Sequence, residues 1–273
     1  MRVMNISMLK RIENLISRTA KNFQAKRFAR YQQCYNQELS FTKAINQFPA
    51  RNELYAYMHY HFSHHCPEAA QQHRAYFKKD QRGFGEDAFH AMWFTLLSEF
   101  KPAQCLEIGV YRGQVVSLWG LIAKLSGFKC EVHGISPFSP AGDGVSTYLA
   151  NLDYLQDTLK SNRHFGLPDP SFMKAFSTDS SAIDFIKSCR WNLIYIDGNH
   201  DYEVALADYE VCRDSLADGG LLVMDDSSLY MDYQPPSFSF AGHPGPSRVV
   251  QEFAMKEMRF LGGVGHNNVF QKV

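Results

Sequence analysis

Residues 104–113 read Gln-Cys-Leu-Glu-Ile-Gly-Val-Tyr-Arg-Gly, and this stretch decides the fold. An apolar run comes first, Gly109 and Gly113 follow it, and an amphipathic pattern then covers 114–126. An apolar run that passes through glycines into a helical pattern is typical of a buried strand followed by a tight turn and a helix. The segment therefore predicts one strand–turn–helix unit of an α/β protein.

The same alternation continues along the chain. Further helical patterns cover 146–162, 180–189 and 202–216, and they separate short apolar runs. The predicted strands are 105–110, 131–136, 172–177, 192–197 and 220–226. Strands alternating with helices predict a parallel sheet that is covered on both faces.

The C-terminal part departs from this alternation. Residues 227–246 hold prolines and aromatic residues without periodicity, which indicates a long loop, and a helix is predicted over 247–258. The apolar runs 258–265 and 267–273 then flank a Gly-His-Asn turn. They predict a closing antiparallel β-hairpin.

The N-terminal region has another texture. Residues 1–95 are rich in Gln, His, Tyr and Phe, which favours a helical cap or oligomerisation region, and residues 96–273 form the predicted main domain. The first thirty residues hold eight Lys and Arg against a single Glu. This basic, amphipathic stretch fits a transit peptide, a membrane-surface helix, or a helix packed on the body or on a partner subunit. The packed helix is favoured, because an apolar stripe usually marks a packing contact.

Composition limits the possible functions. Lys and Arg together number 28, as do Asp and Glu, so the chain lacks the basic surplus of a nucleic-acid binder. No apolar run is long enough to span a membrane. The 6 cysteines form no Cys-x-x-Cys pair, which is typical of a reduced, cytoplasmic protein.

The glycine turn first suggests a dinucleotide site. A Gly-x-Gly-x-x-Gly pattern starting at Gly109 requires glycines where this chain has Tyr111 and Gln114. Because the second glycine admits the pyrophosphate, Tyr111 argues against an oxidoreductase. The Gly-Lys-Ser/Thr of a P-loop is also absent.

Glu107-x-Gly109-x-x-x-Gly113 instead resembles motif I of the class I S-adenosylmethionine-dependent methyltransferases. The resemblance continues in Asp197-Gly-Asn-His-Asp-Tyr-Glu and in Gly-Gly-Leu-Leu-Val-Met-Asp-Asp, which ends at Asp226. Within that superfamily the chain looks most like the branch of macrocin O-methyltransferase and cephalosporin-hydroxylase-like proteins. The resemblance implies a Rossmann-like, seven-stranded, mostly parallel sheet. It also implies S-adenosylmethionine as cofactor and a small acceptor, a sugar or natural-product hydroxyl.

The resemblance also implies a set of cofactor-binding residues. A departure lies at the end of the second strand, where the family usually places an acid for the ribose hydroxyls and this chain has Ser136. A serine makes only one such hydrogen bond, and Asp143 in the next loop could supply the acid. The implied cofactor-binding residues are Glu107, Gly109, Tyr111, Gly113, Ser136, Thr178, Asp179 and Asp197.

Three carboxylates should meet at neighbouring strand ends. Asp197 closes the fourth strand, and Asp225 with Asp226 closes the fifth. Carboxylates brought together repel unless they titrate or share a cation, and all-oxygen ligation selects Mg²⁺, Ca²⁺ or Mn²⁺. A magnesium site is therefore predicted, as the family's metal-dependent O-methyltransferases imply. In the alternative, Asp197 faces the cofactor or substrate while the other two cap loops or pair with lysines.

His200 is the candidate general base, with Asp197 beside it in the reaction site. An acceptor hydroxyl must lose its proton, and histidine can take it near neutral pH. Related sugar O-methyltransferases carry an acidic base about where this chain has Asn199, which cannot serve. His200 could instead cap the helix that follows. The loop 238–246 is expected to line the acceptor pocket, with His243 as a second candidate base.

Two further interpretations of the sequence remain possible, a zinc site and a protein that binds the cofactor without catalysis. The cluster of His59, His61, His64, His65 and Cys66 could suggest zinc, but no partner pair has ligand spacing, so a polar helix face or a substrate lid is favoured. A catalytically silent binding module is the rival to an enzyme, and Ser136 is its best support.

Overall fold

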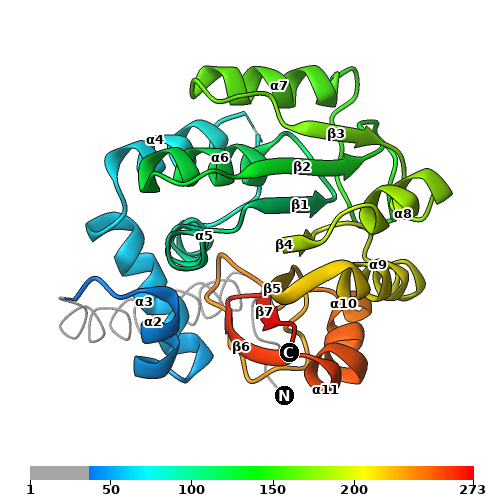
Figure 1. Cartoon of the computed structure of the whole chain (residues 1–273). Coiled ribbons are helices and arrows are strands. Elements are labelled where there is room, and N and C mark those ends of the chain that lie inside the picture. Colours follow the sequence, from blue (N-terminus) through cyan, green and yellow to red (C-terminus); the bar gives the residue numbers. More distant parts are fainter. Residues whose placement is uncertain (1–36, 81) are drawn as a thin grey trace, which may run out of the picture.

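The computed structural model describes residues 37–80 and 82–273, and it contains one seven-stranded sheet of order β3-β2-β1-β4-β5-β7-β6 (Figure 1). The strands β1 to β5 run parallel, and β7 lies antiparallel between β5 and β6. Their bounds are β1 Gln104–Ile108, β2 Glu131–Ser136, β3 Ser171–Lys174, β4 Trp191–Ile196, β5 Leu216–Met224, β6 Arg259–Val264 and β7 Asn267–Gln271. The predicted mostly parallel sheet with a C-terminal antiparallel hairpin is confirmed.

Helices cover both faces of this sheet (Figure 1). On one face α5 packs on α6 and on α3, and on the other face α9 packs on β4, β5 and α10. The helices are α2 Phe41–Gln47, α3 Arg51–His64, α4 Glu68–Phe77, α5 Asp87–Phe100, α6 Gln114–Ser126, α7 Tyr154–His164, α8 Ser180–Lys187, α9 Tyr202–Ser215, α10 Pro244–Val249, the π-helix η1 Val250–Ala254 and α11 Met255–Glu257.

Alternation along the strands separates two cores. In β4, Leu193 and Tyr195 enter the cluster beneath the N-terminal helices, whereas Ile194 and Ile196 enter the cluster beneath α8 and α9. This period of two is what a strand covered on both faces requires. The continuous apolar runs of the sequence are explained by this double burial.

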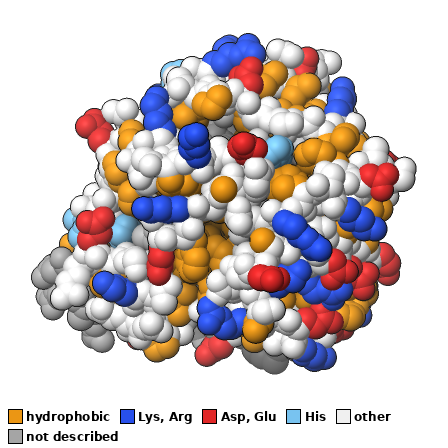
Figure 2. All heavy atoms as spheres, viewed as in Figure 1, with side chains coloured by type: hydrophobic (Ala, Val, Ile, Leu, Met, Phe, Trp, Pro, Cys, Tyr) orange, Lys and Arg blue, Asp and Glu red, His pale blue; other side chains and the backbone are white. Residues whose placement is uncertain are grey.

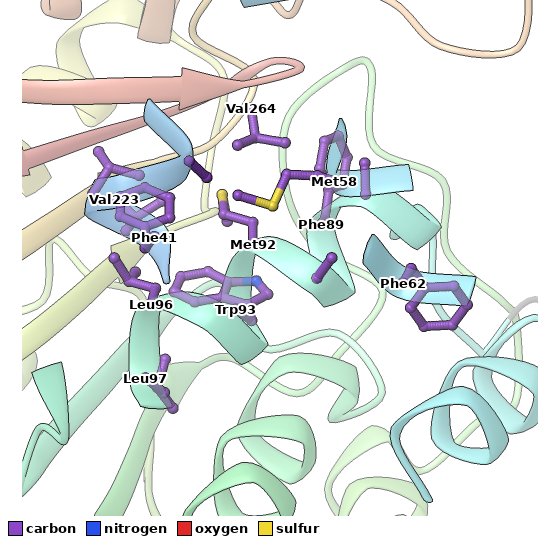
Figure 3. Packing of buried hydrophobic residues seen from close by; sticks show 14 of the residues in the cluster. Phe41, Met58, Phe62, Phe89, Met92, Trp93, Leu96, Leu97, Val223 and Val264 are labelled. Carbon is purple, nitrogen blue, oxygen red and sulfur yellow. The ribbon is translucent and has the colours of Figure 1, made fainter. Parts of the chain in front are cut away.

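The N-terminal helices share the first core with the sheet. Figure 3 shows Phe41, Met58 and Trp93 directed into the same cluster as Val223 and Val264. The helix α5, Asp87–Phe100, crosses the predicted boundary between residues 95 and 96. The division into an N-terminal region 1–95 and a main domain 96–273 stays a prediction.

Several predicted bounds differ from the observed ones. Helix was predicted from residue 146, but α7 begins only at Tyr154, because Asp153 caps it by accepting a 3.0 Å hydrogen bond from the Gln156 N–H. The predicted strand 172–177 ends at Lys174, and β5 begins at Leu216, earlier than predicted. The predicted tail helix starts earlier, at Pro244, and continues through the π-helical turn.

The basic stretch predicted as a helix lies within residues 1–36, outside the described residues. Among the helices that are described, none is both long and apolar enough to cross a membrane.

On the face drawn in Figure 2, acidic and basic side chains are interspersed, with hydrophobic side chains exposed between them. The five cysteines in the described part of the chain, Cys66, Cys105, Cys130, Cys189 and Cys212, are free thiols.

Candidate active site

A cleft of about 1160 Å³ opens at the carboxyl ends of the parallel strands. The turns after β1, β2, β3, β4 and β5 contribute to it, as do the loop before α5 and the long loop before α10. In an open parallel sheet, ligands bind outside this edge. Its rim exposes apolar side chains, with Phe84 at 68% and Phe238 at 64% exposure.

The turn after β1 depends on glycine. Gly109 has a φ of +100°, and a Cβ there would lie 1.7 Å from the backbone oxygen of Asp197. The close approach lets the hydrogen-bond ladder continue past the strands, since the Asp197 N–H donates to the Ile108 oxygen at 2.8 Å. Gly113, at φ +83°, is the N-cap residue of α6 and lies against Thr158 rather than lining the cleft.

This continued ladder brings the acids together. The Asp225 N–H donates to the Ile196 oxygen at 3.0 Å, so Asp197 and Asp225 follow neighbouring strands at the same level. Burial first, and then the negative charges of Asp225 and Asp226, raise the pKa of Asp197 well above its usual range. The buried carboxyl of Asp197 therefore favours its protonated form in the ligand-free protein.

Glu107 is a second acid of this kind. It is 3% exposed, and its Oε2 accepts a 3.2 Å hydrogen bond from the Val116 N–H in the first turn of α6. Burial raises its pKa to about 8, although this hydrogen bond opposes the shift and Asp225 adds to it. Glu107 and Asp197 therefore both favour the protonated form, and among the described residues neither of them forms an ion pair with a basic side chain.

His200 lies between two carboxylates. Its Nδ1 is 2.6 Å from Asp143 Oδ2, and its Nε2 is 2.9 Å from Asp226 Oδ2. Although burial opposes it, these two carboxylates raise the pKa of His200. The hydrogen bonds from His200 and His266 likewise overcome burial and hold the pKa of Asp226 below its usual range. Both ring nitrogens of the predicted base are therefore engaged.

His266, in the β6–β7 turn, joins the same cluster. Its Nδ1 lies 2.9 Å from Asp225 Oδ1 and 2.9 Å from Asp226 Oδ1. Although burial opposes a charged ring, the Asp225 carboxylate raises the pKa of His266 to about 10. Sequence reasoning missed this residue, and its only signal was a histidine in a hairpin turn that returns to the end of β5.

The tail loop contributes His243. Its backbone N–H donates to the Asp226 oxygen at 2.7 Å, and its Nε2 lies 3.8 Å from Asp226 Oδ2. Gly242, at φ +110°, makes this approach possible, because a Cβ there would lie 2.2 Å from the Asp226 oxygen. The loop was expected to line the acceptor pocket, and the structure places Phe238, Phe240 and His243 along the cleft.

The residues predicted to bind cofactor divide into two groups. Those that line the cleft are Glu107, Gly109, Tyr111, Ser136, Thr178 and Asp197. Gly113 does not, and Asp179 Oδ2 instead accepts from the Phe176 N–H at 3.0 Å. Ser136 Oγ accepts a 3.3 Å hydrogen bond from the Phe138 N–H. Asp143, which was suggested as the acid for the ribose hydroxyls, instead accepts hydrogen bonds from the backbone N–H and the Nδ1 of His200.

The groups of side chains that could bind a metal ion differ from the predicted set of Asp197, Asp225 and Asp226. Among the described residues, the groups close enough to share an ion are His200–Asp226–His243 and Asp225–Asp226–His266. Asp197 belongs to neither group. The histidines suggested for zinc form no such group either, since His61 contacts Tyr57 Oη at 3.1 Å while His64 is exposed and stacks on Tyr60.

Comparisons with known proteins agree with this geometry. Residues 106–227 match a family model described as a methyltransferase domain. The SAH-bound methyltransferase PaMTH1 of Podospora anserina aligns with a TM-score of 0.53 and 14% identity, over 76% of this chain and 88% of that one. An O-methyltransferase of Bacillus cereus in complex with SAH aligns with a TM-score of 0.53 and 13% identity, over 78% of this chain and 96% of that one. No curated protein matches the sequence.

The family match and the shared fold confirm the resemblance to the class I S-adenosylmethionine-dependent methyltransferases. The matched residues, 106–227, include the β1 turn and the ends of β4 and β5 that form the cleft. The macrocin-like branch stays a prediction.

Proposed function

We propose that this protein transfers the methyl group of S-adenosylmethionine to a hydroxyl of a small molecule, such as a sugar or natural-product scaffold. The observation that carries the proposal is the cleft, in which the motif I turn, Asp197 and the cluster around Asp226 face one space. The two aligned structures were determined with SAH, the demethylated cofactor, which supports the same cofactor here.

The charge of the cleft fits this cofactor. S-adenosylmethionine carries a sulfonium and an ammonium group, and the cleft offers Glu107 and Asp197, whose pKa values are raised mainly by burial. A bound cation would favour the ionised form of either acid and so be stabilised by it. Asp197 is therefore assigned to the cofactor side of the reaction site.

The acceptor side is assigned to the cluster of His200, Asp226 and His243. A hydroxyl becomes nucleophilic as its proton leaves, and this cluster holds the proton-accepting groups beside the apolar rim. Because the sulfonium is already a reactive donor, holding the two substrates in line supplies much of the rate acceleration.

The predicted magnesium ion fits the observed donors less well. Magnesium prefers near-octahedral oxygen ligation. Here His266 Nδ1 engages an oxygen of both Asp225 and Asp226, and the other Asp226 oxygen faces His200. Metal assistance remains part of the proposal, but with a different ligand set, which is argued below.

The test is a transfer assay with methyl-labelled S-adenosylmethionine and a panel of small hydroxylated acceptors. His200→Ala should lower kcat by about 100-fold on the best acceptor, because general acid–base groups typically contribute that much or more. Cofactor affinity should stay within threefold of wild type. Unchanged turnover in His200→Ala would remove His200 from the reaction.

The second candidate is a silent S-adenosylmethionine-binding module. Ser136 favours it, since its hydroxyl is used by the Phe138 N–H and offers the ribose no carboxylate. Cofactor binding without transfer to any acceptor in the panel would support this candidate. A cytoplasmic location and a homo-oligomer formed through the N-terminal helices complete the proposal and rest on the sequence.

A further inference from the structure

Three side chains from three separate segments converge in the cleft. His200 follows β4, Asp226 follows β5, and His243 comes from the loop before α10. Asp226 Oδ2 lies 2.9 Å from His200 Nε2 and 3.8 Å from His243 Nε2, and all three donor atoms lie within 4.8 Å of one another. The two imidazole rings are 4.2 Å apart, centroid to centroid.

These spacings suit one shared ion. Donors bound at about 2.0–2.2 Å to a tetrahedral or octahedral ion lie roughly 3–3.5 Å from each other. The two measured contacts bracket that range, and a single carboxylate oxygen faces both nitrogens. All three residues line the cleft, so further coordination positions are accessible to a substrate atom.

The remaining nitrogen of His200 is held as metal-bound histidines usually are. Asp143 Oδ2 lies 2.6 Å from Nδ1, and Asp143 Oδ1 is fixed by the N–H groups of Val145 at 3.0 Å and Ser146 at 2.8 Å. A carboxylate on Nδ1 places the ring proton there and leaves the Nε2 lone pair toward the ion.

The other two donors are also fixed before any ligand arrives. The segment after β5 and the tail loop pair through the Ser227–Gly242 bridge, and the Ser228 N–H donates to the Ala241 oxygen at 2.9 Å. This pairing sets His243 beside Asp226. His266 Nδ1 holds the second oxygen of Asp226 at 2.9 Å, which leaves Oδ2 for the cluster.

We propose that His200, His243 and Asp226 form a binding site for a divalent transition-metal ion such as Zn²⁺, Fe²⁺, Mn²⁺ or Co²⁺. Two imidazoles and one carboxylate select these ions over Mg²⁺. The site differs from the predicted magnesium set, because Asp197 and Asp225 are not ligands. Its role rests on the proposed function and refines it: with the ion bound, His200 and His243 act as ligands and no longer as bases, while the ion orients the acceptor oxygen and favours the loss of its proton to solvent.

The experiment uses the tag-free full-length chain, stripped with a chelator and titrated with Co²⁺ in the absence of cofactor and acceptor. Visible absorption reports Co²⁺ ligation, and competition with Zn²⁺ reports the same site. One Co²⁺ per chain is expected, with affinity at least 100-fold weaker in His243→Asn and in His200→Asn. Asp143→Asn should weaken binding about 10- to 100-fold.

Two variants serve as controls. His64→Asn removes an exposed histidine outside the cleft, and Asp225→Asn removes a ligand of the predicted magnesium set. Both should bind Co²⁺ like wild type, with circular dichroism showing that every variant is folded. Absence of stoichiometric binding in wild type would overturn the proposal, as would binding that survives His243→Asn but is lost in Asp225→Asn. A methyltransferase that needs no metal would fail this test while keeping its transfer activity, so the two failures are distinguishable.

Discussion

Single carboxyl groups govern the electrostatics of the cleft. Glu107 is buried beneath the first turn of α6, with one hydrogen bond from Val116 and no cation among its described contacts. Burial therefore raises its pKa to about 8. The folded chain keeps this acid protonated at pH values at which the unfolded chain ionises it.

That shift makes the stability of the ligand-free protein dependent on pH. Between pH 4.5 and about 8 the folded state binds the Glu107 proton and the unfolded state does not, so stability falls as pH rises. The fall from this residue is at most about 1.4 kcal/mol per pH unit. Glu107→Gln, which can still accept from Val116, should unfold in urea with a shallower pH dependence. Parallel curves for the two proteins would show that Glu107 ionises normally in the fold.

Individual residues also mark the limit of sequence reasoning about the site. Asp197, Asp225 and Asp226 could be placed at neighbouring strand ends, because the parallel register follows from the apolar runs. The contact between His200 and Asp143 could not be predicted, because Asp143 lies in a loop 57 residues earlier in the chain. His266 reaches the acids only because β7 inserts between β5 and β6, and no local pattern encodes that order.

Turns and strand ends position the cleft. Most strands and helices could be predicted from hydrophobic periodicity, and the hairpin from its Gly-His-Asn turn. The start of α7 was missed although Asp153 offered an N-cap signal, because the apolar pattern of the preceding loop resembled a helix. The irregular loop before α7 contains Asp143, and it places that carboxylate 2.6 Å from His200 Nδ1 in the site.

The β1 turn gives a sharp test of this dependence. Gly109→Ala places a Cβ 1.7 Å from the Asp197 oxygen at a φ of +100°, so the β1 and β4 ends must separate. We expect roughly 2–4 kcal/mol of destabilisation in urea unfolding, as for other strained backbone substitutions. Gly144→Ala is the matched control, because nothing lies within 4 Å of its Cβ, and it should stay within about 0.5 kcal/mol of wild type. Equal stability of the two variants would contradict the observed β1 turn.

The N-terminal helices and the sheet form one core, in which histidines are buried as neutral groups. His90 Nε2 lies 3.2 Å from His73 Nδ1, and His73 Nε2 lies 2.9 Å from Ser117 Oγ. Burial lowers the pKa of His90 to about 3 and that of His73 well below 6.5. Helices α4, α5 and α6 are thereby joined through groups that cannot accept protons without breaking the core.

Acid should therefore loosen this core. Between about pH 6.5 and 3 the unfolded chain protonates His90 and the folded chain does not, so stability falls as pH falls. His90→Gln removes that contribution, which is at most about 1.4 kcal/mol per pH unit, while its amide can still face His73. Unfolding midpoints from pH 7 to 5 should drop less in His90→Gln than in wild type. An equal drop would mean that His90 is accessible to protons in the folded state.

At the scale of the whole molecule, the proposed cofactor site is the cleft, and a positively charged ligand would stabilise the ionised forms of its buried acids Glu107 and Asp197. Calorimetry with S-adenosylmethionine and with NADH, each with and without Mg²⁺, tests this assignment. We predict micromolar binding of S-adenosylmethionine, no binding of NADH, and an S-adenosylmethionine affinity that Mg²⁺ does not change. Binding of NADH, or no binding of S-adenosylmethionine to the folded chain, would contradict the assignment of the cleft to a methyl donor.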